Sequence, residues 1–270
     1  MSIVNEELPW VLCDVLGVVY AISCKSVLSL NQLLKVTPLP SSPPEIRGVI
    51  DFRGRVIQLV DTRKLLNLKS NQEDINEFCA MMDARYNDHL NWITTLENSV
   101  LNKTKFTLTT DPHKCAFGKW YDSYKPLNRN VTALLKKFDA PHKAVHKLGV
   151  TVEEMINRND HDGAITLINA VRNTELKQMV HLFEEIKQGY KESKSEISVV
   201  LGNDDHCMSI TADEIVAIEH LKEIDQELLD ETMTKADFIV GVGKRKNDSV
   251  VFLMSDEYIL NTYSGCKVSS

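Results

Sequence analysis

The chain has 270 residues, of which 43% are hydrophobic and 26% charged, and its net charge is −7. This composition is typical of a soluble globular protein, and the acidic balance argues against a nucleic-acid binder, which usually has a basic face. No apolar run approaches the roughly 18 residues of a membrane span, and the start of the chain does not resemble a secretory signal, so we expect a cytoplasmic protein.

The first segment, up to about residue 60, has the pattern of short β-strands. Its apolar runs WVLCDV, VVYAI, GVIDF and VIQLV are rich in β-branched residues and are separated by turn signals. Four prolines within 38–44 predict an irregular connection. Gly54, within the run FRGRV, predicts a tight hairpin between two strands.

From about residue 71 to 193 the hydrophobic period becomes that of helices. Apolar residues within 75–100 recur every three or four positions, which predicts one long helix, and a second such stripe covers 165–190. Shorter helices are predicted to start near Asp111 and Asp139, where an aspartate that can cap a helix is followed by a proline. About four helices, two long and two short, predict an antiparallel bundle.

Strand patterns return from residue 196, in the runs ISVVLG, HCMSIT, EIVAI, FIVGVG and SVVFLM. A helical block at 69–195 therefore separates two β-rich pieces, 1–68 and 196–270. Two independent β domains would fit this order, but an insertion is more economical, because neither piece is large enough for a comfortable core. Insertions are tolerated at loop tips whose ends lie close together. The predicted fold class is α+β.

Four residues of the helical block suit a metal. His142 and His146 are four positions apart, so on a helix their rings share one face, although solvated or core histidines often show the same spacing. His89 lies on the first apolar stripe and Cys115 near a predicted helix start, and each could simply be a buried residue. Taken together, three imidazoles and a thiolate make a tetrahedral zinc set drawn from three helices, as metal sites in bundles are.

The other histidines and cysteines have weaker interpretations. His113, two residues before Cys115, is a competing ligand, whereas His161 and His181 are typical of surfaces or helix ends. The six cysteines form no CxxC pair, and we expect reduced thiols that are mostly buried. They are Cys13, Cys24, Cys79, Cys115, Cys207 and Cys266.

The chain contains the motifs HLNW, CAFGKWY and HKAVH. Their order and intervals are similar to those of the signature blocks of the chemoreceptor zinc-binding domain, so the stretch 71–190 resembles that domain. The resemblance implies a four-helix bundle that binds one zinc ion through His89, Cys115, His142 and His146, and it allows a homodimer through the bundle. It also implies sensing of zinc or of oxidants such as hypochlorous acid. Zinc holds Cys115 as a thiolate, which is the oxidisable form.

The stretch PEIRGVIDFRGRVIQLVDTRKLLNL and the later runs ADEIVAI and FIVGVGKRKNDSVVFLMSDEYIL resemble CheW-type coupling domains, over 8–68 and 196–260. This resemblance implies paired SH3-like β-barrels that bind the histidine kinase CheA and the cytoplasmic tips of chemoreceptors. Arg47 and Arg53 match arginines near that partner-binding surface. Their alternative interpretation is ordinary solvated surface charge.

No catalytic motif accompanies these residues. The chain has no HExxH or GxSxG motif, and GVGKRKND lies between two predicted strands, which favours a charged hairpin turn over a phosphate loop. A shell of four protein ligands is closed, whereas a zinc hydrolase keeps a water ligand. We therefore predict a non-enzymatic signalling scaffold. The alternative is a structural or zinc-buffering protein without kinase coupling.

Overall fold

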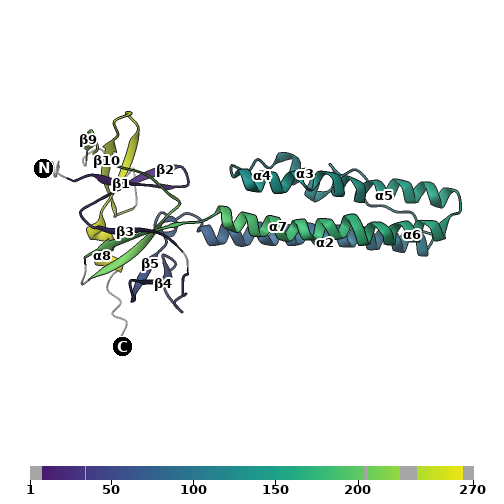
Figure 1. The fold of residues 1–270 in the computed structure, drawn as a ribbon, viewed down its shortest axis with the longest axis horizontal. Coiled ribbons are helices and arrows are strands. Elements are labelled where there is room, and N and C mark those ends of the chain that lie inside the picture. The colour runs from purple at the N-terminus through teal and green to yellow at the C-terminus, as the bar shows by residue number, and fades with distance from the viewer. Residues whose placement is uncertain (1–7, 34, 204–205, 226–235, 264–270) are drawn as a thin grey trace. The chain divides into compact units, whose positions relative to one another are not determined.

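The computed structural model describes residues 8–33, 35–203, 206–225 and 236–263, and it has an α+β architecture (Figure 1). The chain divides into two compact units: a β unit, made of 1–71 and 195–270, and a helical unit, 72–194. Among the described residues, no helix is long and apolar enough to cross a membrane.

The β unit holds two sheets. Their strands are β1 (Trp10–Val15), β2 (Val18–Ser23), β3 (Val27–Gln32), β4 (Ile46–Phe52), β5 (Arg55–Val60), β6 (Ile197–Gly202), β7 (Cys207–Ala212), β8 (Glu214–Glu219), β9 (Glu223–Asp225), β10 (Ile239–Lys244) and β11 (Val250–Met254). One sheet has the order β8-β1-β2-β11-β10-β9 and the other the order β3-β6-β7-β5-β4. Each sheet thus pairs strands that precede the helical unit with strands that follow it. The two chain segments therefore fold together.

All nine predicted strand runs form strands, and both predicted hairpins are present. Arg53 and Gly54 join β4 to β5 with φ values of 54° and 79°, the positive pair of a type I′ turn. In the charged turn between β10 and β11, the Arg245 N–H donates to the Ser249 carbonyl at 2.9 Å. The pattern does not predict β3, which has no fully buried residue, or β9, which has only three residues.

Two short helices complete the β unit, α1 (Thr62–Leu65) and α8 (Asp256–Tyr263), and the sequence pattern predicts neither. Both contribute to the largest buried cluster of the unit. That cluster includes Val11, Ile22, Val60, Leu65, Val199, Ile210 and Ile259.

The helical unit consists of α2 (Asn71–Leu101), α3 (Ala116–Ser123), α4 (Arg129–Lys136), α5 (Asp139–Asn157), α6 (His161–Val171), the π-helical turn η1 (Arg172–Leu176) and α7 (Lys177–Ser193). Both long predicted helices are confirmed, the second as α6, η1 and α7 in direct succession. The sequence does not predict α4, and α5 is longer than the short helix expected there. Figure 1 shows α2 alongside α7, where Lys187 pairs with Asp83 at 2.6 Å.

The aspartates expected to cap α3 and α5 have other roles. Cys115 caps α3, which begins at Ala116, whereas Asp111 accepts the His113 N–H at 3.0 Å in the preceding turn. Helix α5 does begin at Asp139, but its N-cap is Phe138, and the Asp139 carboxylate pairs with Lys143 at 2.8 Å. Because α4 leads almost directly into α5, no extended residue is available for a side-chain cap.

Candidate metal centre

His89 of α2, Cys115 at the start of α3, and His142 and His146 of α5 lie together inside the helical unit. One ligand atom from each residue lies within 4.8 Å of the corresponding atoms of the others. The histidines are 3%, 5% and 0% exposed, respectively, and Cys115 is partly buried. Residues that are far apart in the sequence therefore form one buried group of metal donors.

Two backbone carbonyls fix which nitrogen each of two histidines presents to the cluster. His89 Nδ1 lies 2.7 Å from the Arg85 carbonyl, and His146 Nδ1 lies 3.2 Å from the Thr109 carbonyl. Since a carbonyl only accepts, each Nδ1 carries the proton and donates, and each Nε2 keeps its lone pair.

Both of these Nε2 atoms are buried and have no hydrogen-bond partner among the described residues. An unpaired buried acceptor is costly. A zinc ion, which takes imidazole nitrogen and thiolate sulfur, would satisfy both lone pairs and would bind Cys115 as well. The residues present therefore fit zinc.

Cys115 is placed by the start of α3. Its Sγ accepts the Gly118 N–H at 3.1 Å and lies 3.2 Å from His142 Nε2. Burial raises the pKa of the Cys115 thiol, although the N–H bonds from Gly118 and Phe117 act in the opposite direction. Without metal the group is therefore a thiol near neutral pH, and metal binding must displace its proton.

The three histidines are neutral near physiological pH. Burial, reinforced by the charge of neighbouring imidazoles, lowers the pKa of His142 to about 3 and that of His146 to about 4. Burial also lowers the pKa of His89, against the opposing effect of its bond to the Arg85 carbonyl. Neutral imidazole is the form that binds a metal.

Aromatic side chains and the Thr109 carbonyl hold the donors in place. The Phe117 ring packs 5.0 Å from that of His142, and the Trp92 ring 5.2 Å from that of His146. The Trp92 indole N–H also donates to the Thr109 carbonyl at 2.8 Å, so Trp92 and His146 share one acceptor. Sequence reasoning does not assign this role to Trp92, although it lies in the HLNW motif.

A cavity of about 340 Å³ adjoins the cluster. It is lined by Asp88, His89, Asn91, Trp92, Leu108, Thr109, Cys115, Ala116, Phe117 and His146. Three of the four donors therefore border a space large enough for small solutes, so that a chelator or an oxidant can approach the thiol.

The remaining predicted histidines lie outside the cluster. His113 is 59% exposed and pairs with Asp122 at 2.9 Å, so it does not compete with Cys115. His181 is exposed on α7, and His161 begins α6, as expected of surface and helix-end residues. The start of α3 places the Cys115 sulfur 3.2 Å from His142 Nε2, whereas the His113 ring pairs with Asp122 outside the cluster.

The expectation that most cysteines are buried is wrong for the described residues. Only Cys13 is fully buried, whereas Cys24, Cys79, Cys115 and Cys207 are partly exposed and all five are free thiols. Cys24 follows the end of β2 and Cys207 begins β7, positions at strand ends that the core does not cover. Cys266 lies outside the described residues.

The two arginines are in the β unit, in different settings. Arg47 forms an ion pair with the buried Glu196 at 2.5 Å, and its own side chain is 19% exposed. Arg53 is exposed in the β4–β5 turn, with its guanidinium 4.9 Å from the centre of the Phe52 ring. Arg47 therefore has a structural partner within the fold, whereas Arg53 faces solvent.

Two known domain families match parts of this chain. Residues 9–90 match the CheW-like domain, and residues 89–153 match the chemoreceptor zinc-binding domain. The chain thus carries a CheW-like domain and a chemoreceptor zinc-binding domain, and the metal of the second domain is zinc. Its candidate site is the group of three histidines and one cysteine, all of which lie within 89–153.

One curated protein and one solved structure are similar to this chain. The chemotaxis protein CheW of Bacillus subtilis (strain 168) is 33% identical over 97 residues, which are 36% of this chain and 61% of that protein. The chain therefore spans less than two thirds of the length of this relative. A crystal structure of the scaffolding protein TtCheW from Thermoanaerobacter tengcongensis gives a TM-score of 0.42 at 9% identity, covering 92% of this chain and 84% of that chain.

Proposed function

We propose that this chain is a non-enzymatic, cytoplasmic scaffold of chemotaxis-type signalling, and that its helical unit binds one zinc ion through His89, Cys115, His142 and His146. The observation that carries the proposal is the group of four donor atoms within 4.8 Å of one another. They lie in a segment that matches a zinc-binding domain, in a chain whose first segment matches the CheW-like domain.

The proposal includes the domain plan. Residues 1–68 and 196–270 form one CheW-like domain of paired SH3-like barrels, and residues 69–195 are an inserted zinc-binding domain with the form of an antiparallel four-helix bundle. The mixed strand order of the two sheets supports the insertion. In the helical unit, α2, α5 and the succession α6–η1–α7 are three rods of such a bundle, and α3 with α4 supplies the fourth.

The proposed partners are the histidine kinase CheA, the cytoplasmic tips of chemoreceptors, or both. Arg53 is the better candidate for a contact with them, because it is exposed, whereas Arg47 is paired with Glu196. A homodimer through the exposed faces of the helical unit is part of the same proposal.

The signal would be zinc occupancy or the oxidation state of Cys115. Its thiolate attacks hypochlorous acid, the sulfur loses two electrons to chlorine, and the products are a sulfenic acid and chloride. A sulfenic acid is a weaker ligand, so the three histidines would lose their shared partner. The cavity beside Cys115 supports access by such a small oxidant.

Pull-down experiments test the coupling role. Zinc-loaded and zinc-stripped protein would each be incubated with CheA and with receptor tips, and a variant with Arg53→Glu would serve as the docking control. We expect retention of at least one partner, a difference between the two metal states, and a loss with Arg53→Glu. Binding to neither partner in either state would contradict the scaffold role.

A second candidate, a purely structural zinc, is favoured by the burial of the cluster. The three histidines are at most 5% exposed, and closed four-ligand sites are usually structural. Zinc release after one equivalent of hypochlorite separates the two functions. A structural site would keep its zinc, whereas a sensing site would release it as Cys115 is oxidised.

A further inference from the structure

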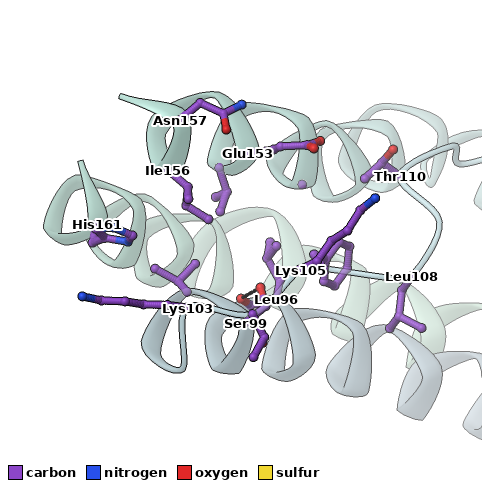
Figure 2. Close-up of a pocket in the computed structure, with 15 residues that line it drawn as sticks. Leu96, Ser99, Lys103, Lys105, Leu108, Thr110, Glu153, Ile156, Asn157 and His161 are labelled. Carbon is purple, nitrogen blue, oxygen red and sulfur yellow. Dashed lines mark hydrogen bonds between the residues drawn. The ribbon is translucent and has the colours of Figure 1, made fainter. Parts of the chain in front are cut away.

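A second cavity lies at the end of the helical unit where α2 ends and α6 begins. It has a volume of about 410 Å³ and lies between the last turns of α2, the loop 102–110 and α5 (Figure 2). This volume is within the range of small-molecule sites. The lining belongs to one compact unit, and none of the four metal donors takes part.

The floor of this cavity is apolar and firmly packed. Leu96, Val100 and Val152 are at most 3% exposed, so this floor is part of the core of the unit. Phe106 and Ile156 are partly buried beside it, and the Phe106 ring packs 5.1 Å from that of Trp92. An apolar group placed here would therefore meet a preformed surface.

The rim of the cavity is charged. Lys103 and Lys105 are exposed, and neither forms an ion pair among the described residues. Glu153 lies on α5 and its carboxylate extends toward the Thr110 side of Figure 2, as the Lys105 ammonium does, whereas the Lys103 side chain extends toward the His161 side. The two lysines and the glutamate together leave a formal charge of +1 on the lining. The rim thus offers two cations to one anion above an apolar floor.

Two further local features belong to this end of the unit. Lys103 has φ +53°, and the bond from the Thr104 N–H to the Ser99 carbonyl at 2.9 Å completes a helix-ending motif that favours glycine at position 103. His161 has a buried Nδ1 without a hydrogen-bond partner among the described residues. Both side chains line the cavity.

We propose that this cavity binds a small monocarboxylate with an apolar body. Its carboxylate would pair with Lys103 or Lys105, and its apolar body would lie against Phe106, Val152 and Ile156. The carboxylate of the ligand neutralises the excess positive charge of the rim. A ligand that carries an ammonium group as well as the carboxylate has no net charge and would leave that excess in place. This site is separate from the zinc cluster, and its ligand does not depend on the chemotactic role.

Three probes with one apolar body test the choice of head group. They are 4-phenylbutanoate, its neutral amide and 2-amino-4-phenylbutanoate, each titrated by calorimetry into the full-length protein. We expect the carboxylate to bind roughly fivefold tighter than the amide, the gain of a well-placed exposed ion pair, and to lose that advantage at high salt. Equal binding of carboxylate and amide, or tighter binding of the amino acid, would overturn the proposal.

Charge variants test the location. Lys103→Gln with Lys105→Gln should weaken 4-phenylbutanoate to the level of the amide, whereas Glu153→Gln should strengthen it several-fold, roughly the size of an exposed charge interaction. These residues are exposed, so the fold should be unaffected. The matched controls change the same charges on exposed residues outside the cavity.

The controls are Lys136→Gln with Lys177→Gln, and Glu154→Gln. If the control variants change the affinity for 4-phenylbutanoate as much as the cavity variants do, the effect depends only on the net charge of the protein, and a site at this cavity is refuted. Lys103→Gly gives an independent check, because it should weaken carboxylate binding while relieving the strained backbone at this position. Unchanged binding in Lys103→Gly and in the double lysine variant would likewise overturn the proposal.

Discussion

At the residue scale, the protonation of the four donors determines how the metal centre responds to pH. His142 and His146 are neutral well below neutrality, since their pKa values are about 3 and about 4. The Cys115 thiol, whose pKa is raised by burial, is still protonated at pH 7. Zinc binding therefore exchanges one proton, from the cysteine and not from the histidines.

This exchange predicts that zinc affinity rises about tenfold per pH unit between about pH 6 and pH 8, because the thiolate fraction of the metal-free protein rises by that factor. Competition with a chelator of known proton affinity measures the slope. Cys115→Ala should bind zinc more weakly and with a nearly flat profile. A slope near two in the unchanged protein would mean that a histidine also loses a proton, contrary to the lowered pKa values.

A second residue-scale prediction concerns Trp92. Its indole N–H holds the Thr109 carbonyl, which in turn orients His146. Trp92→Phe keeps an aromatic ring but removes this bond, and loss of such an indirect support typically weakens metal binding about tenfold or more. Trp120→Phe is the control, because Trp120 stacks on Tyr124 and donates no hydrogen bond to the Thr109 carbonyl. Equal zinc affinity of the two variants would contradict this role.

The grouping of the four donors could be predicted from the sequence, because the three motifs that carry them resemble the signature blocks of the chemoreceptor zinc-binding domain. The groups that orient these donors could not be predicted. The carbonyls of Arg85 and Thr109 belong to the backbone, which every residue has, so no residue type marks them. The capping role of Cys115 was hidden for a related reason, since Asp111 has the stronger capping propensity yet lies in the turn before the helix.

At the element scale, the turn before α3 positions the thiol. A Cβ on Gly118 would lie 1.8 Å from the Pro112 carbonyl oxygen, so the turn and the helix can approach this closely only at a glycine. Gly118→Ala must push the 112–115 turn away and move Cys115 with it. We therefore expect a loss of zinc affinity together with a lower melting temperature, measured by chelator competition and by calorimetry.

The matched control for this change is Gly189→Ala on α7. A Cβ at position 189 would meet only the Leu134 Cδ1, which lies at the end of a flexible side chain. In a helix interior, alanine is also favoured over glycine by roughly 1 kcal/mol, so this variant should be at least as stable as the parent. Equal zinc affinity in Gly118→Ala and Gly189→Ala would show that the turn does not set the site.

The loop 102–110 contributes residues to the lining of both cavities of the helical unit. Leu108 lines both, and Thr109, whose carbonyl orients His146, is followed by Thr110 in the lining of the second cavity. A carboxylate bound at the second cavity would order this loop. We predict that saturating 4-phenylbutanoate raises zinc affinity about fivefold, the lower end of typical coupling, and that zinc raises the affinity for the carboxylate by the same factor.

Calorimetric titration of each ligand in the presence and absence of the other measures this coupling. Because the two factors must agree at equilibrium, unequal factors would indicate a technical error and equal factors of one would exclude coupling. Lys103→Gln with Lys105→Gln is the control, since it should remove the effect of the carboxylate on zinc and leave zinc binding itself unchanged.

Elements with strong hydrophobic periods could be predicted, and those held mainly by their neighbours could not. The helix α2 and the nine strand runs could be predicted because their apolar residues, which are buried in the structure, recur at regular spacing in the sequence. In contrast, β3 contains only partly buried or exposed residues and depends on its pairing with β6. The short α4 is similar, because its two buried residues, Val131 and Leu135, are too few to form a stripe.

At the scale of the whole molecule, the sheets explain why the helical unit can be an insertion. The parallel pairings β2–β11 and β5–β7 join strands from the two ends of the chain, and neither sheet contains any residue of 72–194. The order of elements along the sequence predicts an insertion on grounds of size alone. It does not predict these pairings, which depend on contacts across more than a hundred residues.

The ends of the insertion lie close together, since the Lys194 ammonium is 4.0 Å from the Asp74 carboxylate. Replacing 72–194 by a short glycine-serine linker should therefore close the chain at little entropic cost, and the remaining β unit should still unfold cooperatively. Circular dichroism during thermal unfolding would report loss of the helical signal and retention of a single β transition.

The shortened protein also tests whether partner binding belongs to the β unit and zinc dependence to the helical unit. If the β unit alone holds the docking surface, the deletion variant should bind the same partner as the full chain, with an affinity that no longer changes when zinc is added or removed. The full chain, treated identically, should keep its dependence on zinc. A deletion variant that folds but binds no partner would place the docking surface on the helices, whereas one that fails to fold would show that the two segments need the insertion to pair.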